Sequence, residues 1–197
     1  MKKLALGIAT AAVLVTAAAP AVAQVGFYAG PGILSGRLVI PIHDERGELV
    51  AYCGRAVDGR QPRYRFPSGF PKSQVVFNLH RAAAAAGQQV VVLVEGFFDC
   101  LKLYQAGVRS VVALMGSALY GPQQGALLQR FPRLILMLDG DVAGRRATAD
   151  IAARLGAHCS VQVVHLPQRM QPDQMSADQI RHALLSCRNT NVIGPIQ

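Results

Sequence analysis

The sequence predicts an α/β fold with a roughly four-stranded parallel sheet that is covered by helices on both faces. Four apolar runs of strand length alternate with stretches of helical pattern between Val90 and His165. Gly107 and Gly156 follow two of these helical stretches, as glycine commonly does at the end of a helix. The runs are apolar on both faces, which is typical of strands in a buried parallel sheet.

A smaller, basic subdomain is expected ahead of this sheet. Residues 37–42 and 48–53 are apolar runs or alternate between apolar and polar residues, and the polar segment 43–47 separates them. This pattern predicts a β-hairpin. A basic loop rich in proline and glycine follows. Asn78 is then expected to cap a helix over residues 79–86. We therefore expect a hairpin and basic loop, closed by one helix.

In the main domain, strand and helix patterns alternate. The strands are expected at 90–94, 110–114, 133–138 and 160–165, and the helices at 97–106, 123–130 and 143–155. A last helix is expected to begin at Ser176, because Ser176 and Gln179 have the spacing of a capping box. Alternating strands and helices imply right-handed crossovers and therefore a parallel sheet.

Composition suggests where these parts begin and end. We expect a leader at 1–23, a linker at 24–35, the basic subdomain at 36–87, the α/β domain at 88–187 and a tail at 188–197. The leader has two lysines, an uncharged apolar stretch and small residues before Gln24, which is the pattern of a secretory signal peptide. Its apolar stretch is short for a membrane span, so no membrane segment is expected in the mature chain.

Acidic residues follow two of the predicted strands. Glu95 comes directly after 90–94, and Asp139 and Asp141 follow 133–138. Ligands of α/β sheets bind beyond the carboxyl ends of the strands. Carboxylates gathered there repel one another and are typically held together by a hard cation such as Mg²⁺. For either segment alone, an acidic turn or a charge at a helix N-terminus is the alternative.

These acidic segments resemble the Toprim domain shared by topoisomerases and bacterial primases. The resemblance lies in Glu95-Gly96-Phe97-Phe98-Asp99, Ala113-Leu114-Met115-Gly116-Ser117-Ala118-Leu119 and Asp139-Gly140-Asp141-Val142-Ala143-Gly144-Arg145. Within that superfamily the chain is most similar to bacterial-type DNA primases, because residues 36–47, 51–55, 62–64 and 76–80 resemble the primase stretch that precedes the Toprim fold. A topoisomerase is excluded, because strand passage needs further domains that 197 residues cannot house.

The resemblance implies metal-dependent nucleotidyl transfer, with RNA primers made on single-stranded DNA during replication. It implies that Asp139 and Asp141 coordinate Mg²⁺ or Mn²⁺. Glu95 would share a metal or act as general acid/base for the 3′-hydroxyl that attacks the incoming nucleotide. Asp99 is expected to orient Glu95 or a metal-bound water.

The chain departs from the primase pattern in several places. Gln171 stands where primases carry the first acid of a further pair, whereas Asp173 retains the second acid and is expected to bind metal. The loss of one carboxylate puts a second metal in doubt. No zinc site is expected, because the four cysteines are widely spaced and include no Cys-x-x-Cys pair. Nothing resembles the first part of the polymerase core, so a truncated core with weak catalysis is expected.

Charge favours a polyanionic partner. The formal net charge is +9, and a basic stretch over residues 55–72 alternates with aromatic side chains, which suits a single strand of nucleic acid. A solvated basic loop is the alternative. The residues expected to contact nucleic acid or nucleotide are Arg55, Arg63, Tyr64, Lys72, Gly116, Ser117 and Arg145.

Three functions are open at this point. A primase-like enzyme would have single-stranded DNA, nucleoside triphosphates and a replicative helicase as partners. A Toprim nuclease would use the same acids to cleave a phosphodiester bond. A degenerate protein would bind nucleic acid without catalysis. The primase resemblance places the protein in the cytoplasm, whereas the leader at 1–23 favours export.

Overall fold

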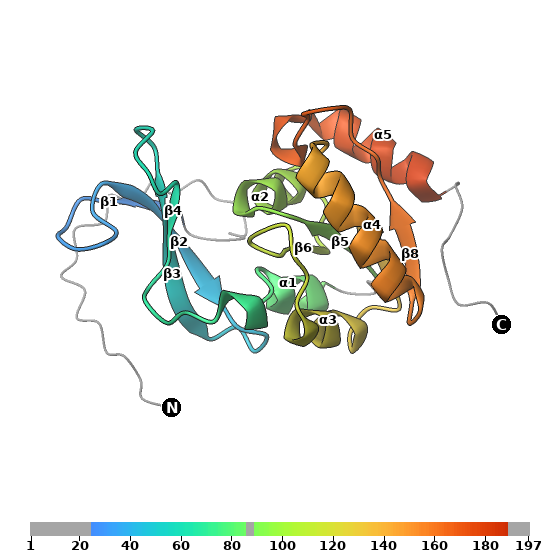
Figure 1. The fold of residues 1–197 in the computed structure, drawn as a ribbon, viewed down its shortest axis with the longest axis horizontal. Helices are drawn as coiled ribbons and strands as arrows, with labels where there is room; N and C mark the ends of the chain where they lie inside the picture. The colour runs from blue at the N-terminus through green and yellow to red at the C-terminus, as the bar shows by residue number, and fades with distance from the viewer. Residues whose placement is uncertain (1–24, 86–88, 189–197) are drawn as a thin grey trace. The chain divides into compact units, whose positions relative to one another are not determined.

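The computed structural model describes residues 25–85 and 89–188 (Figure 1). The expected leader at 1–23 and the tail beyond residue 188 lie outside the described residues. The chain divides into two compact units. One contains the described residues up to 42 together with 50–70, and the other contains 43–49 and the described residues from 71 onward. We expected the segment from 71 to 85 to belong to the basic subdomain. It belongs instead to the unit that contains the parallel sheet.

The first unit is built on an antiparallel sheet in the order β1-β2-β3-β4. Its strands are β1 Gly26–Tyr28, β2 Arg37–His43, β3 Leu49–Ala56 and β4 Tyr64–Arg65. Strands β2 and β3 are the hairpin that the sequence predicts. Part of the range 24–35, which we expected to be a linker, forms β1, with Phe27 opposite Leu38 of β2.

Arg37 organises this unit from within. Its side chain is buried, and its guanidinium donates to the backbone carbonyl of Pro62 at 2.9 Å. Longer contacts of 3.4 Å reach the carbonyls of Gly54 and Arg63. A buried guanidinium is tolerated because these carbonyls replace the water that it loses. Arg37 is therefore a structural cation, although it belongs to the excess of positive charge that favours a polyanionic partner.

The second unit contains the predicted parallel sheet, in the order β6-β5-β7-β8. Its strands are β5 Val90–Val94, β6 Val111–Ala113, β7 Arg133–Leu136 and β8 Ser160–Val163. Its helices are α1 Leu79–Ala84, α2 Phe97–Gln105, α3 Gly121–Leu128, α4 Val142–Gly156 and α5 Ala177–Arg188, and short 3₁₀ helices form η1 Lys72–Gln74 and η2 Pro172–Gln174.

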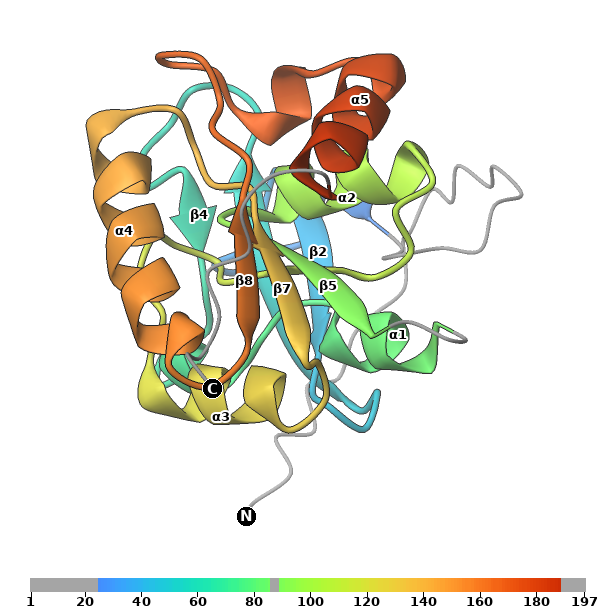
Figure 2. The same cartoon turned by 90° about the vertical axis from the view of Figure 1, so that its right-hand side faces the viewer.

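Both faces of this sheet are covered, as predicted. Val91 and Leu93 of β5 join one core cluster with residues of α1, α3 and α4, while Val92 faces the opposite way. This alternation follows from the two-residue period of a strand. Figure 2 shows α4 and α5 on opposite sides of the sheet.

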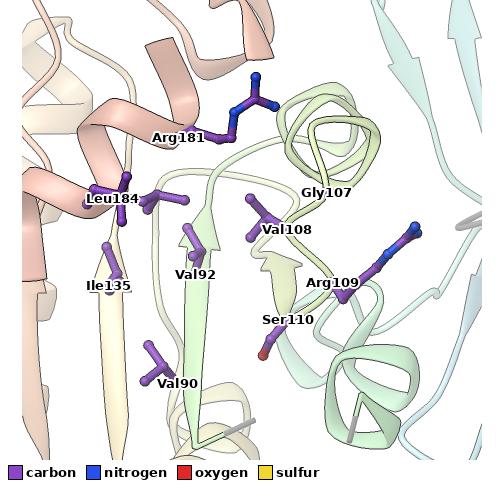
Figure 3. Close-up of a pocket in the computed structure, with 10 residues that line it drawn as sticks. Val90, Val92, Gly107, Val108, Arg109, Ser110, Ile135, Arg181 and Leu184 are labelled. Atoms are coloured by element: carbon purple, nitrogen blue, oxygen red, sulfur yellow. The ribbon is translucent and has the colours of Figure 1, made fainter. Parts of the chain in front are cut away.

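An apolar pocket of about 300 Å³ lies on the face that carries α5 (Figure 3). Its lining includes Val92, Ile135 and Leu184, together with Arg109 and Arg181. Acidic residues do not line it, so the pocket is separate from the predicted chemistry.

The order of the strands creates a switch point. The chain passes from β5 through α2 to β6, and then returns through α3 to β7 on the other side of β5. Because right-handed crossovers in opposite directions lie on opposite faces, the helices separate beyond the carboxyl ends of β5 and β7, where crevices form in this class of fold. Ligands of open α/β sheets bind at such a point.

Two local predictions about helix starts have different outcomes. Ser176 and Gln179 form the predicted capping box, with reciprocal bonds of 3.1 and 2.8 Å between side chain and backbone. Asn78 does not cap α1 with its side chain: its φ is 67°, and its amide donates to the carbonyl of Val111 at 2.9 Å. Asn78 is buried beside β6, so a tertiary partner takes the side chain that would otherwise cap the helix.

The four cysteines are buried. Cys53, Cys100, Cys159 and Cys187 are thiols and form no disulfide among the described residues. Burial raises the pKa of the Cys100 thiol above its ordinary value, which keeps it protonated and unreactive.

Candidate metal and nucleic-acid site

Glu95 and Asp139 meet at the switch point. Glu95 follows β5 directly, and Asp139 follows β7 after two further buried residues. A carboxylate oxygen of Glu95 accepts a hydrogen bond from the backbone amide of Asp139 at 3.1 Å. This contact joins two segments 44 residues apart, and it arises because β5 and β7 pair in parallel with Leu93 opposite Leu136.

Asp141 is the N-cap of α4. Its Oδ1 accepts from the backbone amide of Gly144 at 2.7 Å, and its side chain is exposed. Gly144 is required here, because a Cβ at this position would lie 2.2 Å from the carbonyl oxygen of Asp139 and 2.7 Å from Glu95. The start of α4 can therefore pack closely against both acids only if residue 144 is glycine.

Asp99 and Asp173 form the other side of the acidic cluster. One oxygen of Asp99 accepts from the backbone amide of Gly96 at 2.9 Å, which caps α2. The other accepts from the backbone amide of Asp173 at 3.1 Å. Asp99 therefore holds the segment that carries Asp173, and it influences Glu95 through its charge.

Gln171 is in direct contact with the cluster. Its side-chain amide donates to Oδ2 of Asp139 at 2.6 Å. The sequence shows that Gln171 stands where primases carry an acid. Nothing in the sequence, however, predicts its contact with Asp139. It depends on how the loop before η2 folds back onto Gly140.

The acids raise one another's pKa values. Burial, reinforced by the charge of Asp139, raises the pKa of Glu95 to about 7. The same causes raise the pKa of Asp99 to about 7. Two carboxyls with pKa values near neutrality indicate that burial and mutual repulsion outweigh the hydrogen bonds that favour their ionised forms.

Hard carboxylate oxygens of this kind are the ligands that Mg²⁺ and Mn²⁺ prefer, so the residues present fit such an ion by their chemistry. Across residues 25–85 and 89–188, however, no three His, Cys, Asp or Glu side chains are grouped closely enough to hold one ion. The convergence of Glu95, Asp139 and Asp141 on a single metal stays a prediction.

Without metal, stability should fall as the pH rises through neutrality. Because the pKa values of Glu95 and Asp99 are raised, the folded protein binds more protons than the unfolded chain between the ordinary carboxyl pKa and about pH 7. The free energy of unfolding therefore decreases across this window and stays lower above it. His80, with its pKa lowered to about 4, has the opposite effect below its ordinary value of 6.5.

The measurement is therefore made above the histidine range. In EDTA, we expect the Tm to drop by several degrees between about pH 6.5 and about pH 8. In Glu95→Gln the drop should be smaller. An equal drop in wild type and Glu95→Gln would show that Glu95 does not titrate here.

In the first unit, three of the predicted nucleic-acid residues lie together. Arg55 of β3 is opposite Tyr64 of β4. The guanidinium carbons of Arg55 and Arg63 lie 5.9 and 5.8 Å from the centroid of the Tyr64 ring. Cations at this distance are attracted by the ring face. The arrangement presents one aromatic ring and two guanidiniums, a combination that suits single-stranded nucleic acid.

The other predicted residues lie in the second unit with the acids. Lys72 Nζ is 3.5 Å from where a Cβ of residue 116 would be, so the lysine lies beside this loop at an ordinary contact distance. The backbone amide of Gly116 donates to the carbonyl of Glu95 at 3.1 Å, which fixes this loop beside the acid. Ser117 is exposed on the same loop. Arg145 is exposed and donates to the carbonyl of Gly140 in the aspartate turn.

Sequence reasoning missed Gln123. This side chain is fully buried, and its amide donates to the carbonyl of Val75 at 2.9 Å and to that of Lys72 at 3.3 Å. Gln123 thereby ties η1, which carries Lys72, to α3. A lone amide on the apolar face of a predicted helix is the signal that could have revealed it.

Comparisons with known proteins now identify this arrangement. Residues 92–176 match a family model described as Toprim-like, and residues 23–83 match one described as DNA primase catalytic core, N-terminal domain. A solved structure of the Aquifex aeolicus primase with its zinc-binding and RNA polymerase domains has a TM-score of 0.70 and 32% identity, over 79% of this chain and 41% of that one. The described core is primase-like and has the Toprim fold. The expected Toprim fold and primase resemblance are thus confirmed.

Curated relatives agree with this result. The chain is 37% identical over 144 residues to a DNA primase from Aquifex aeolicus, covering 70% of this chain and 29% of the relative. It is 42% identical over 118 residues to a DNA primase from Synechococcus elongatus, covering 56% and 17%. The chain thus spans less than a third of the length of these relatives. The primase match begins at residue 23, earlier than the residue 36 at which we expected the resemblance to begin.

A further primase structure was solved with nucleic acid. The RNA polymerase domain of the Mycobacterium tuberculosis primase, in complex with a double-stranded DNA oligomer with a 6-nucleotide overhang, has a TM-score of 0.64 and 27% identity, over 77% of this chain and 53% of that one. Separately, no helix among the described residues is long and apolar enough to cross a membrane.

Proposed function

We propose that this protein performs metal-dependent nucleotidyl transfer, making RNA primers on single-stranded DNA during replication. The observation that carries the proposal is the contact of Glu95 with Asp139 at the switch point of a primase-like Toprim sheet. In this fold class, ligands bind where these two residues lie.

The acids have distinct parts in this proposal. Glu95, Asp139 and Asp141 would hold Mg²⁺ or Mn²⁺, with Asp173 as a further ligand. A bound ion would supply neutralisation of the charge on the triphosphate and the leaving group. Alternatively, if Glu95 does not bind the ion, its pKa near 7 suits it to accept the proton of an attacking 3′-hydroxyl, because a general base works best when its pKa lies near the working pH.

Cationic and polar groups would bind the template and the nucleotide. Lys72, Gly116 and Ser117 lie on the Glu95 side of the second unit, and Arg145 lies at the aspartate turn. Tyr64, with its two flanking arginines, offers a stacking surface for a base. The complex of the mycobacterial primase with overhanging DNA supports a nucleic-acid partner. Likeness to primases alone supports nucleoside triphosphates, a replicative helicase and action in the cytoplasm.

A second candidate is a protein that binds nucleic acid without catalysis. The contact of Gln171 with Asp139 favours it, because a neutral amide stands on one of the proposed metal ligands. Incubation with labelled ribonucleotides, Mn²⁺ and a single-stranded DNA template separates the candidates. Template-dependent extension supports the primase proposal, and cleavage of the template supports a nuclease. Binding with neither reaction supports the non-catalytic candidate.

Binding of single-stranded DNA should weaken steeply with salt. If Arg55, Arg63 and Tyr64 bind along a phosphate backbone, the plot of log affinity against log salt concentration should have a negative slope. Arg63→Ala should make this slope less negative by about one unit. Arg109→Ala is the matched control, because Arg109 is also exposed and lies 4.4 Å from the ring of Tyr104, but in the second unit. Fluorescence anisotropy at several salt concentrations measures the slopes. An equal effect of the two variants would exclude a specific part for Arg63.

A further inference from the structure

The loop before η2 is bound to the aspartate turn at several points. The backbone amide of Gly140 donates to the carbonyl of Met170 at 2.8 Å, and that of Arg169 donates to the carbonyl of Gly140 at 3.1 Å. A Cβ at Gly140 would lie only 2.0 Å from the carbonyl oxygen of Pro167, so the close approach requires glycine. The residue that follows Met170 is therefore held beside the carboxylates.

That residue is Gln171. Its backbone amide donates to Oε1 of Gln174 at 3.0 Å, which fixes the start of η2. Its side chain donates to Oδ2 of Asp139 at 2.6 Å. An ionised carboxylate only accepts hydrogen bonds, so the NH₂ group of the glutamine must face Asp139. A neutral donor thus occupies an oxygen of a proposed metal ligand.

We infer that Gln171 is a positioning residue that competes with the divalent cation for Asp139 and so keeps the metal affinity of this site low. The inference rests on the proposed function, in which Asp139 binds metal. A hydrogen bond to a charged acceptor is stronger than a neutral one. The NH₂ group uses one lone-pair site of this oxygen, and its partial positive charge opposes a cation that approaches the same oxygen. In the metal-free protein the same bond stabilises Asp139 among neighbouring acids.

The neighbouring segment shows why charge matters at this position. Asp173 lies two residues further on, and the carboxylate that binds its amide is that of Asp99. An acid at residue 171 would place a negative charge beside Asp139, which would attract a cation and repel the other acids. Glutamine fills the same space without this charge. Compared with an acid at this position, glutamine therefore favours the metal-free state of the cluster.

The test compares Mn²⁺ binding by four forms of the full chain at one pH, with free Mn²⁺ measured by electron paramagnetic resonance. The forms are wild type, Gln171→Glu, Gln171→Leu and Gln174→Glu. We expect Gln171→Glu to lower the Kd about tenfold or more, which corresponds to one charge-assisted hydrogen bond. Gln171→Leu removes the donor without adding charge, so it should lower the Kd less.

Gln174→Glu is the matched control. It adds the same charge three residues along on an exposed side chain, and its carboxylate can still accept from the backbone amide of Gln171. Its Kd should stay close to that of wild type. Thermal melts in EDTA provide a second readout, in which Gln171→Glu should have a lower Tm than wild type because its carboxylates repel one another.

The outcomes separate this inference from the proposed function. Two outcomes would overturn the inference without affecting the proposed function. One is a Kd for Gln171→Glu equal to that of wild type, and the other is a Kd for Gln171→Leu higher than that of wild type. If Gln171→Glu does not fold, the Kd of the uncharged Gln171→Leu decides. Binding of Mn²⁺ by Gln171→Glu but not by wild type would support the inference. No binding by any form would overturn the inference and the metal-dependent function together.

Discussion

Asp139→Asn combined with Asp141→Asn is expected to abolish the stabilisation that Mn²⁺ gives to this protein. A ligand that binds only the folded state at about 100 times its Kd adds about 2.7 kcal/mol to the free energy of unfolding. For a chain of this size, that energy raises the Tm by several degrees. The double variant removes two of the four proposed ligand charges. Asparagine is also a good N-cap, so the cap at residue 141 should be kept.

The same variant should behave differently without metal. The charge of Asp139 raises the pKa of both Glu95 and Asp99, so its removal should reduce the repulsion within the cluster. We therefore expect the Tm in EDTA to rise or stay unchanged. Asp150→Asn is the control, because Asp150 is an exposed acid of α4 that pairs with Arg154. If Mn²⁺ still raises the Tm of the double variant, the metal binds elsewhere.

The parallel sheet could be predicted from sequence because its determinants are local. Each strand is an apolar run that ends at a polar or turn residue, and the helices between them are marked by glycine at their ends. The positions of Glu95 and Asp139 follow from the same pattern, because both come just after a strand. Their contact at 3.1 Å could be expected once the strands were taken to be neighbours.

What the sequence did not predict depends on contacts between distant residues. Asn78 has the local features of a cap, yet its side chain binds the carbonyl of Val111, 33 residues away. Arg37 is one of several arginines in the sequence, but burial among three carbonyls gives it a structural part. Gln171 reaches Asp139 only because Gly140 allows the loop to approach closely. Local propensity contains no information about partners of this kind.

Glu95→Gln is expected to lower template-directed incorporation of ribonucleotides by about 10²- to 10⁴-fold, the usual contribution of a general acid or base. Glutamine has the same shape, and its side-chain carbonyl can still accept from the backbone amide of Asp139, so the fold should be kept. Incorporation is measured with labelled ribonucleotides, Mn²⁺ and a single-stranded template.

Binding of DNA distinguishes a catalytic part from a structural one. If Glu95→Gln keeps the fold, its affinity for single-stranded DNA and the salt dependence of that affinity should match those of wild type. A loss of fold would lower both. Asp150→Asn, which removes a negative charge outside the cluster, should retain the wild-type rate. Equal incorporation by wild type and Glu95→Gln would exclude Glu95 as the base. A wild type that binds Mn²⁺ and DNA without incorporation would instead support the non-catalytic candidate, because the acids would then hold an ion without moving a proton.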